Sequence, residues 1–234
     1  MKFNFVAFDL DGTLYPDYRI HSRLIPFAIK EHRLLRAMGK ARKQLRYVGG
    51  YEEDKDFYDL QAGLMGEILG EPMEKVKEKT ERLIYRGWEP YFKKIKLFPH
   101  VIETLDVFRQ KGIKMGLLSD FPPETKLKYL KLAEYWDVVL CTEQVGRLKP
   151  DTAPFFELAS KMGQTPENIL YVGNRLSYDV YGAQKAGMKA ALIHSRWKKQ
   201  PTMTTNSKET GSPEKVLADF TFYDYRQLRD YVLG

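Results

Sequence analysis

Short apolar runs alternate with longer amphipathic stretches over much of the chain, and this alternation predicts an α/β fold. Four of the runs are rich in β-forming residues and short enough to be buried strands. They are residues 5–8, 112–118, 137–141 and 169–172. Helical spacing precedes the second run, at residues 99–111, and helical stretches separate the later runs. The pattern therefore predicts a doubly wound, mainly parallel sheet of the Rossmann-like kind.

The alternation is lost between residues 17 and 94, where apolar residues recur at helical spacing instead. The first such stretch predicts one long helix with Ser22 as its N-cap, Pro26 in or near its first turn, and its end at Gly49-Gly50. Its apolar stripe consists of Phe27, Leu34, Met38, Ala41, Leu45 and Val48.

Two further helices are predicted in the same region, at residues 57–69 and 72–86. We therefore expect a smaller α-helical domain, residues 17–94, inserted into an α/β core made of residues 1–16 and 95–234. Long insertions between elements often have a binding role, which favours contact with a substrate. The alternative is a helical spacer without such a role.

The last part of the chain mixes an irregular segment with regular elements. Residues 197–213 are rich in Lys, Thr, Ser, Gln and Pro and show no periodicity, which predicts a mobile loop. A strand at residues 219–223 and a helix from Tyr225 follow.

Polar residues stand at or after the end of each of the four apolar runs. They are Asp9, Asp11, Thr13, Ser119, Asp120, Lys149, Asn174 and Asp179. Because parallel strands end at the same edge of a sheet, we expect these side chains to form one site. Asp9 and Asp11 could share the work of a reaction. One acid would attack a substrate or hold a cation, and the other would transfer protons. The alternative is an ordinary strand end with solvated acids.

With these motifs in this order, the chain resembles the haloacid dehalogenase-like hydrolase superfamily, whose members are mostly phosphatases. The matching motifs are residues 9–14, Ser119, Lys149 before Pro150, and residues 173–179. The resemblance covers residues 3–14 and 97–194. It implies that the helical insert is a cap over the active site.

The resemblance also implies a reaction: magnesium-dependent hydrolysis of a small phosphorylated metabolite through an aspartyl-phosphate. Asp9 would attack phosphorus, and Asp11 would protonate the leaving alcohol and then activate water. Thr13 would orient Asp11 and contribute to binding of the substrate phosphate. Ser119 and Lys149 would bind the phosphoryl group, and Lys149 would also restrain Asp9.

The expected magnesium ligands are Asp9, Asp11, Asn174 and Asp179, since magnesium prefers oxygen donors. Asn174 stands where the family usually has an aspartate, so we expect weaker metal affinity. Asp120, placed by the resemblance near the phosphate, stands where asparagine is frequent. These departures leave two alternatives open: a catalytically weak or silent domain that binds phosphorylated ligands or proteins, and a phosphomutase.

Composition is compatible with such an enzyme. Of the 234 residues, 43% are hydrophobic and 29% are charged, as in ordinary globular proteins. No apolar stretch is long enough to span a bilayer, and Asp9 interrupts the first one, so we expect no membrane partner and no signal peptide. The single cysteine, Cys141, excludes an internal disulfide and predicts a cytoplasmic location. The oligomeric state and the substrate are left open.

Basic residues gather in one segment. Residues 23–47 contain eight Lys or Arg and one Glu, a net +7 that equals the net charge of the whole chain. Four of them define a basic stripe on one side of the predicted helix: Arg33, Arg36, Lys40 and Lys43. A solvated helix face is the default interpretation, and steering of a phosphorylated substrate is the functional alternative. A nucleic-acid partner is disfavoured because no recognition motif accompanies the stripe.

Overall fold

The computed structural model describes residues 1–47, 56–195, 202–206 and 213–234. These residues form a six-stranded sheet of order β3-β2-β1-β4-β5-β8, in which every neighbouring pair is parallel. Its strands are β1 (Phe5–Phe8), β2 (Lys114–Ser119), β3 (Val138–Cys141), β4 (Ile169–Gly173), β5 (Lys189–Ile193) and β8 (Phe220–Phe222). The predicted α/β class and the predicted strands are thus confirmed, whereas β5 was not predicted.

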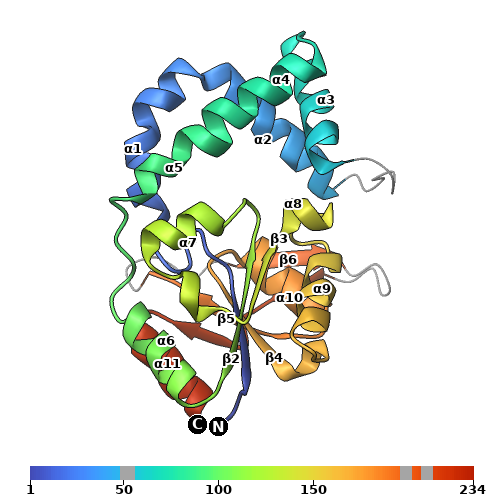
Figure 1. Cartoon of the computed structure of the whole chain (residues 1–234). Coiled ribbons are helices and arrows are strands. Elements are labelled where there is room, and N and C mark those ends of the chain that lie inside the picture. The colour runs from blue at the N-terminus through green and yellow to red at the C-terminus, as the bar shows by residue number, and fades with distance from the viewer. Residues whose placement is uncertain (48–55, 196–201, 207–212) are drawn as a thin grey trace.

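Helices cover both faces of the sheet (Figure 1). Alternate residues of a strand point to opposite faces, and in β1 Val6 and Phe8 belong to one apolar cluster while Ala7 belongs to the other. The first cluster includes side chains of α6 (Val101–Gln110), α7 (Glu124–Leu130) and α11 (Tyr225–Leu233). The second includes side chains of α9 (Ala153–Lys161) and α10 (Tyr181–Lys185). The core is therefore doubly wound.

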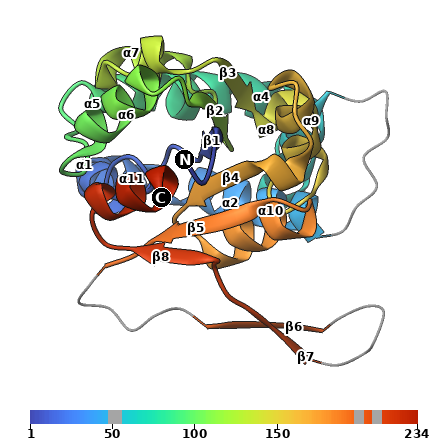
Figure 2. The same ribbon diagram turned by 90° about the horizontal axis from the view of Figure 1, so that it is seen from below.

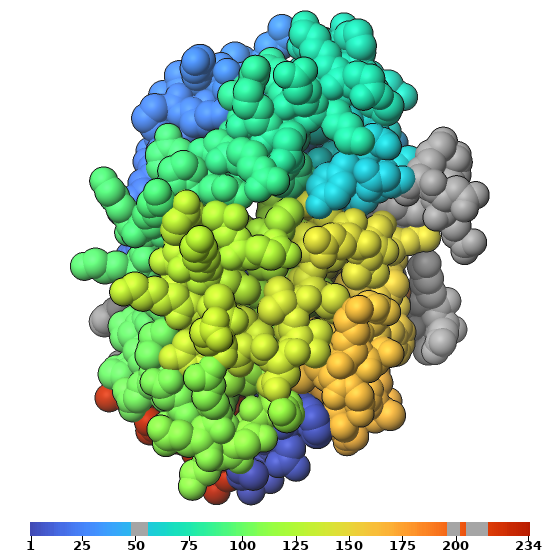
Figure 3. Space-filling model, viewed as in Figure 1, coloured from blue at the N-terminus to red at the C-terminus, as the bar shows by residue number. Residues whose placement is uncertain are grey.

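The segment after β1 forms a separate helical layer above the strand ends (Figure 1). Its elements are α1 (Asp17–Lys30), α2 (His32–Tyr47), α3 (Phe57–Leu69), α4 (Met73–Thr80), a π-helical turn (Glu81–Tyr85) and α5 (Arg86–Phe92). The layer has an apolar cluster of its own, which includes Leu34 and Met38 of α2 with Met65 of α3. The space-filling view shows the layer packed against the core (Figure 3).

The first helix of the layer begins earlier than predicted. It starts at Asp17, directly after Pro16, and a carboxylate in the first turn is favoured by the helix dipole. Ser22 therefore lies inside α1 and is not its N-cap, and its hydroxyl donates to the carbonyl oxygen of Arg19 at 3.3 Å. Pro26 consequently lies inside α1 rather than in its first turn.

The single long helix that the periodicity predicts is in fact two helices, interrupted at Glu31. The apolar stripe itself is confirmed, since Leu34, Met38 and Ala41 are buried in α2. The spacing continues across the break, so periodicity alone could not reveal it. The predicted helix end at Gly49-Gly50 and the stripe residue Val48 lie outside the described residues.

The helix predicted at residues 72–86 is longer than expected. It continues through the π-helical turn into α5, past Pro90, and ends at Phe92. A proline near the end of a helix loses one backbone hydrogen bond without disrupting many turns. The helix predicted at residues 57–69 has the predicted bounds.

Part of the expected loop at residues 197–213 is a strand. β6 (Met203–Asn206) pairs antiparallel with β7 (Pro213–Val216), near the β8 edge of the sheet (Figure 2). Val216 is buried in the second apolar cluster, with Met203 packed against it. This pairing depends on contact with the core, which composition does not reveal. Among the described residues, no helix is both long and apolar enough to cross a membrane.

Candidate active site

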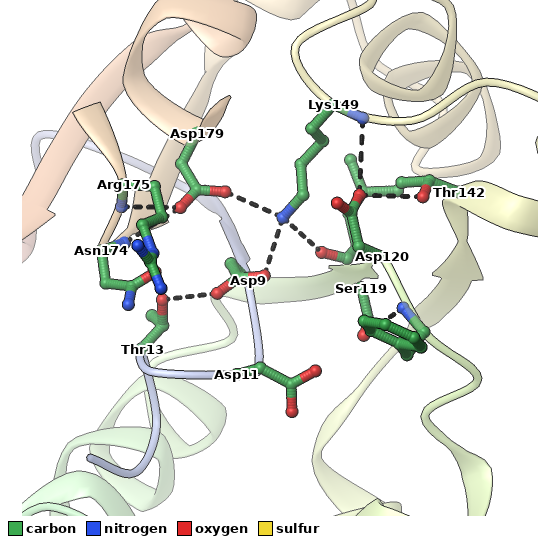
Figure 4. Close-up of polar contacts among 12 residues, drawn as sticks. Asp9, Asp11, Thr13, Ser119, Asp120, Thr142, Lys149, Asn174, Arg175 and Asp179 are labelled. Atoms are coloured by element: carbon green, nitrogen blue, oxygen red, sulfur yellow. Dashed lines mark hydrogen bonds and ion pairs between the residues drawn. The ribbon is translucent and has the colours of Figure 1, made fainter. Parts of the chain in front are cut away.

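Asp9 lies immediately after β1 and is buried at the carboxyl edge of the sheet (Figure 4). Its Oδ1 accepts a hydrogen bond from Lys149 Nζ at 2.7 Å, and its Oδ2 accepts one from Thr13 Oγ1 at 2.7 Å. Burial outweighs the attraction of Lys149 and raises the pKa of Asp9 to about 7. The two hydrogen bonds therefore hold the carboxyl group in place, and the group gains or loses its proton near neutral pH.

Lys149 is shared between two carboxylates. Its Nζ also donates to Asp179 Oδ1 at 2.8 Å, and it lies 3.2 Å from the Tyr171 hydroxyl and 3.3 Å from the carbonyl oxygen of Leu118. Burial alone would lower the pKa of Lys149, but Asp179 and Asp9 hold it well above its usual value. The ammonium group stays charged and offsets part of the negative charge of the two carboxylates.

Asp179 also holds the loop after β4. Its Oδ2 accepts hydrogen bonds from the backbone N–H groups of Asn174 at 3.1 Å and Arg175 at 2.9 Å. Gly173 permits this approach, because a Cβ there would clash with the Asp179 side chain. Asn174 donates weakly to Asp17 at 3.4 Å, whereas its buried Oδ1 has no hydrogen-bond partner. That oxygen is a candidate ligand for a cation.

Asp11 is oriented by residues other than the one predicted. Tyr15 donates to its Oδ1, and Lys126 Nζ lies 2.5 Å from its Oδ2. Thr13 was expected to orient Asp11, but its hydroxyl donates to Asp9 instead. These contacts place Asp11 at the end of the site that faces the helical layer.

The turn that follows Asp11 explains the change of partner for Thr13. Gly12 has a φ of 85°, a left-handed conformation that side chains with a Cβ rarely adopt. A Cβ at Gly12 would also clash with Asn174 and Asp17. The chain therefore reverses tightly after Asp11, and the turn brings Thr13 back to Asp9.

Ser119 and Asp120 follow β2 but differ in their surroundings. Ser119 is buried, and its Oγ accepts a hydrogen bond from the backbone N–H of Phe121 at 3.3 Å. Asp120 Oδ1 accepts from Thr142 Oγ1 at 2.9 Å, and Asp120 Oδ2 lies 2.6 Å from Arg46 Nη2. Burial would raise the pKa of Asp120, but the charge of Arg46 above all holds it at about 2. Both Asp120 oxygens are engaged, and an ionised carboxylate repels phosphate.

Two arginines of α2 join the helical layer to this site. Arg42 is buried, donates to Glu143 and Gln61, and reaches the carbonyl oxygen of Asp120 at 2.9 Å. Arg46 donates to the carbonyl oxygen of Lys149 as well as to Asp120. In the sequence, both arginines are part of the basic segment at residues 23–47, and no site role was predicted for them.

A usable signal for these arginines existed in the sequence. Arg42 and Arg46 follow Met38 at spacings of four and eight, which places them on the buried side of α2. The basic stripe defined above is exposed, as its default interpretation expected.

A cavity of about 550 Å³ lies beside Asp11, between the core and the helical layer. Core residues such as Lys126 and Phe121 line it, together with residues of α1 and α5. A reacting group held at Asp9 could therefore extend past Asp11 into this space.

No cluster of three or more His, Cys, Asp or Glu side chains in the described part of the chain has the arrangement of a metal site. Two kinds of oxygen lie at the site: those of the Asp9 carboxylate and the unpaired amide oxygen of Asn174. Magnesium binds through one or two carboxylates and retains several waters, so this mixed set fits it.

The chain is similar in sequence to characterised phosphatases. It is 28% identical over 202 residues to phosphoglycolate phosphatase of Salmonella typhi, covering 78% of this chain and 77% of that protein. It is also 28% identical over 242 residues to glyceraldehyde 3-phosphate phosphatase of Methanopyrus kandleri. That alignment covers 97% of this chain and 96% of that protein.

Solved structures share the fold over the whole chain. A HAD phosphatase from Thermococcus onnurineus has a TM-score of 0.61 and 25% identity and covers 100% of this chain and 98% of its own. A 2-haloacid dehalogenase from Pseudomonas syringae has a TM-score of 0.61 and 24% identity. The match covers 99% of this chain and 98% of the dehalogenase chain. The family model of haloacid dehalogenase-like hydrolases matches residues 3–187. This chain therefore belongs to the haloacid dehalogenase-like hydrolases.

Proposed function

We propose that this protein is a magnesium-dependent phosphatase that hydrolyses small phosphate monoesters through an aspartyl-phosphate at Asp9. The observation that supports this best is the buried Asp9 carboxylate, held between Lys149 and Thr13 with Asp11 at the mouth of a cavity. The two phosphatases named above support the same reaction class.

In the first step, an Asp9 oxygen attacks phosphorus, and the bond between phosphorus and the ester oxygen breaks. Asp11 gives its proton to the departing alcohol. Lys149 offsets the negative charge, and the Ser119 hydroxyl donates to a phosphoryl oxygen. In the second step, Asp11 takes a proton from water, which attacks phosphorus, releases phosphate and restores Asp9.

When bound, magnesium would reduce the repulsion between the anionic nucleophile and the phosphate. Asp9, the carbonyl of Asp11 and the amide oxygen of Asn174 would hold it. Asp179 acts on this site by anchoring the Asn174 backbone and Lys149, so its link to the metal is indirect or through water.

Residues 17–94 are the cap in this proposal, and residues 1–16 and 95–234 are the catalytic core. The separate apolar cluster of the helical layer supports the division. The position of the layer above the strand ends supports its role in covering the site and excluding water.

The test is hydrolysis of 4-nitrophenyl phosphate with magnesium chloride and with excess EDTA. We expect turnover only with the metal and a loss of at least about 10³-fold in kcat for Asp9→Asn. Asp230→Asn, an exposed change on α11, is the matched control and should keep wild-type activity. An active Asp9→Asn enzyme, or full activity in EDTA, contradicts the mechanism.

Failure of turnover on a broad panel of phosphate esters would instead favour a phospho-ligand-binding domain. Mass spectrometry of the protein after rapid mixing with substrate provides a second readout. It should detect a phosphoryl adduct on the wild type that is absent from Asp9→Asn.

A further inference from the structure

The cavity beside Asp11 is large for a small acidic alcohol. Its volume of about 550 Å³ lies within the range of about 300–1,000 Å³ that is typical of small-molecule pockets. Glycolate, the alcohol portion of phosphoglycolate, would leave most of it unfilled. The space beyond the reacting phosphate therefore suits a bulkier alcohol.

The walls of the cavity are largely apolar. Both the helical layer and the core contribute such side chains. They are Ile20, Leu24, Ile84, Trp88, Phe92 and Phe121. Trp88 and Phe121 approach each other across the two parts of the chain with ring centroids 6.4 Å apart. Such a surface is stabilised by contact with an apolar group, which removes it from water.

The charged residues of the lining are predominantly acidic. The described residues that line the cavity include five carboxylates, two cations and one histidine, His21. The carboxylates are Asp11, Asp17, Glu81, Glu89 and Glu124.

Both cations already pair with acids of the same lining. Lys126 lies 2.5 Å from Asp11, and Arg86 lies 2.9 Å from Glu81 and 3.2 Å from Glu89. A substrate carboxylate would meet net repulsion and would have to displace an existing ion pair.

We propose that this cavity binds the alcohol portion of the substrate, and that it selects phosphate monoesters whose alcohol is bulky, apolar and free of negative charge. The proposal rests on the phosphatase function proposed above. It differs from the substrates named for the two sequence relatives, which are small and, in the case of phosphoglycolate, carry a carboxylate.

Four esters separate size from charge. Ethyl phosphate is small and neutral in its alcohol portion, and phosphoglycolate is small and acidic. 2-Phenylethyl phosphate is bulky and apolar, and its para-carboxylate derivative is bulky and acidic. We expect kcat/KM for 2-phenylethyl phosphate to exceed the kcat/KM of each of the other three esters by about tenfold or more. The phenyl group fills the apolar part of the cavity, and its alcohol portion has no negative charge for the lining to repel. Equal or higher kcat/KM values for ethyl phosphate, phosphoglycolate or the para-carboxylate derivative would overturn the proposal.

The same esters should also be titrated into Asp9→Asn by calorimetry. That variant leaves the cavity lining unchanged, so the order of dissociation constants tests the cavity even if turnover is absent. Tightest binding of 2-phenylethyl phosphate supports the proposal, and a different order contradicts it. Turnover of 4-nitrophenyl phosphate tests the phosphatase function separately.

Two variants tie the preference to the lining. Trp88→Ala should reduce the advantage of 2-phenylethyl over ethyl phosphate by about tenfold, while Trp88→Phe should retain most of it. Glu89→Gln should raise kcat/KM for the para-carboxylate derivative relative to kcat/KM for 2-phenylethyl phosphate, because it removes one negative charge from the lining. Phe156→Ala and Glu157→Gln, exposed changes on α9, are the controls. If the preference is the same in all of these variants, the cavity does not bind the alcohol.

Discussion

Arg46 Nη2 lies 2.6 Å from Asp120 Oδ2 and so links the last turn of α2 to the residue that follows Ser119. The same guanidinium donates to the carbonyl oxygen of Lys149. One side chain of α2 therefore contacts the segments that contain Asp120 and Lys149, and the neighbouring Arg42 forms a buried ion pair with Glu143. The position of the layer and the arrangement of the site are physically coupled through these arginines.

Removing one partner of the buried Arg42–Glu143 pair should be costly. Arg42→Met leaves the Glu143 carboxylate buried without its counter-charge, and we expect unfolding free energy to fall by about 3–5 kcal/mol. Urea denaturation measures this. Arg86→Met, which breaks exposed pairs with Glu81 and Glu89, should cost less than about 1 kcal/mol. Recovery of stability in Arg42→Met with Glu143→Leu would confirm the cause, whereas equal losses for Arg42→Met and Arg86→Met would refute it.

The raised pKa of Asp9 predicts the acid side of the pH profile. The nucleophile must be ionised, and its pKa is about 7, so kcat/KM should fall as pH decreases below about 7. A bound cation favours the carboxylate, so raising magnesium concentration should move this limb to lower pH. Rates at several magnesium concentrations provide the measurement. A limb near pH 4 that does not respond to magnesium would contradict the assignment to Asp9.

Thr13→Val should affect the same limb. The substitution keeps the side-chain shape but removes the hydrogen bond to Asp9, which stabilises the charged form, so the limb should move to higher pH. Thr13→Ser retains the hydroxyl and should behave like the wild type. If Thr13→Val instead lowers kcat at every pH with an unmoved limb, Thr13 acts on Asp11 or on the phosphate.

Asn174→Asp should lower the magnesium concentration that gives half-maximal activity, by about tenfold. It places a charge where an unpaired buried oxygen now lies and hardly alters side-chain size. Asn168→Asp, in the turn before β4, is the control. An unchanged magnesium requirement would remove Asn174 from the ligand set.

The exposed basic stripe should have little effect on turnover. Charge reversal at Arg36 and Lys40 is expected to leave kcat/KM unchanged for anionic substrates at every ionic strength, as for a solvated face. A decrease at low salt that disappears as salt is added would show that the stripe steers substrate.

The local sequence was sufficient to predict five of the six strands of the main sheet and the order of the site residues. Apolar runs of strand length are followed by Asp9, Ser119, Lys149 and Asn174, directly or after a loop. This order places chemistry at one sheet edge, because parallel strands share that edge. The buried Cys141 agrees with its predicted place in a strand, while a cytoplasmic location stays a prediction.

Tertiary structure decided which partner each polar side chain has. Arg46 and Asp120 are 74 positions apart, and Arg42 and Glu143 are 101 apart, so no local pattern could pair them. Charge counting put Arg42 and Arg46 with the solvated residues of α2, but burial against the core gives them a different role.

The tight turn at Gly12 decided the partner of Thr13 in the same way. The cavity beside Asp11 exists only because two separately encoded parts of the chain meet there. Periodicity and motif spacing are properties of neighbours in the chain, whereas burial and charge pairing depend on neighbours in space. The sequence by itself therefore determined the α/β class and the candidate chemistry, and the packing of the helical layer on the core decided how that chemistry is held.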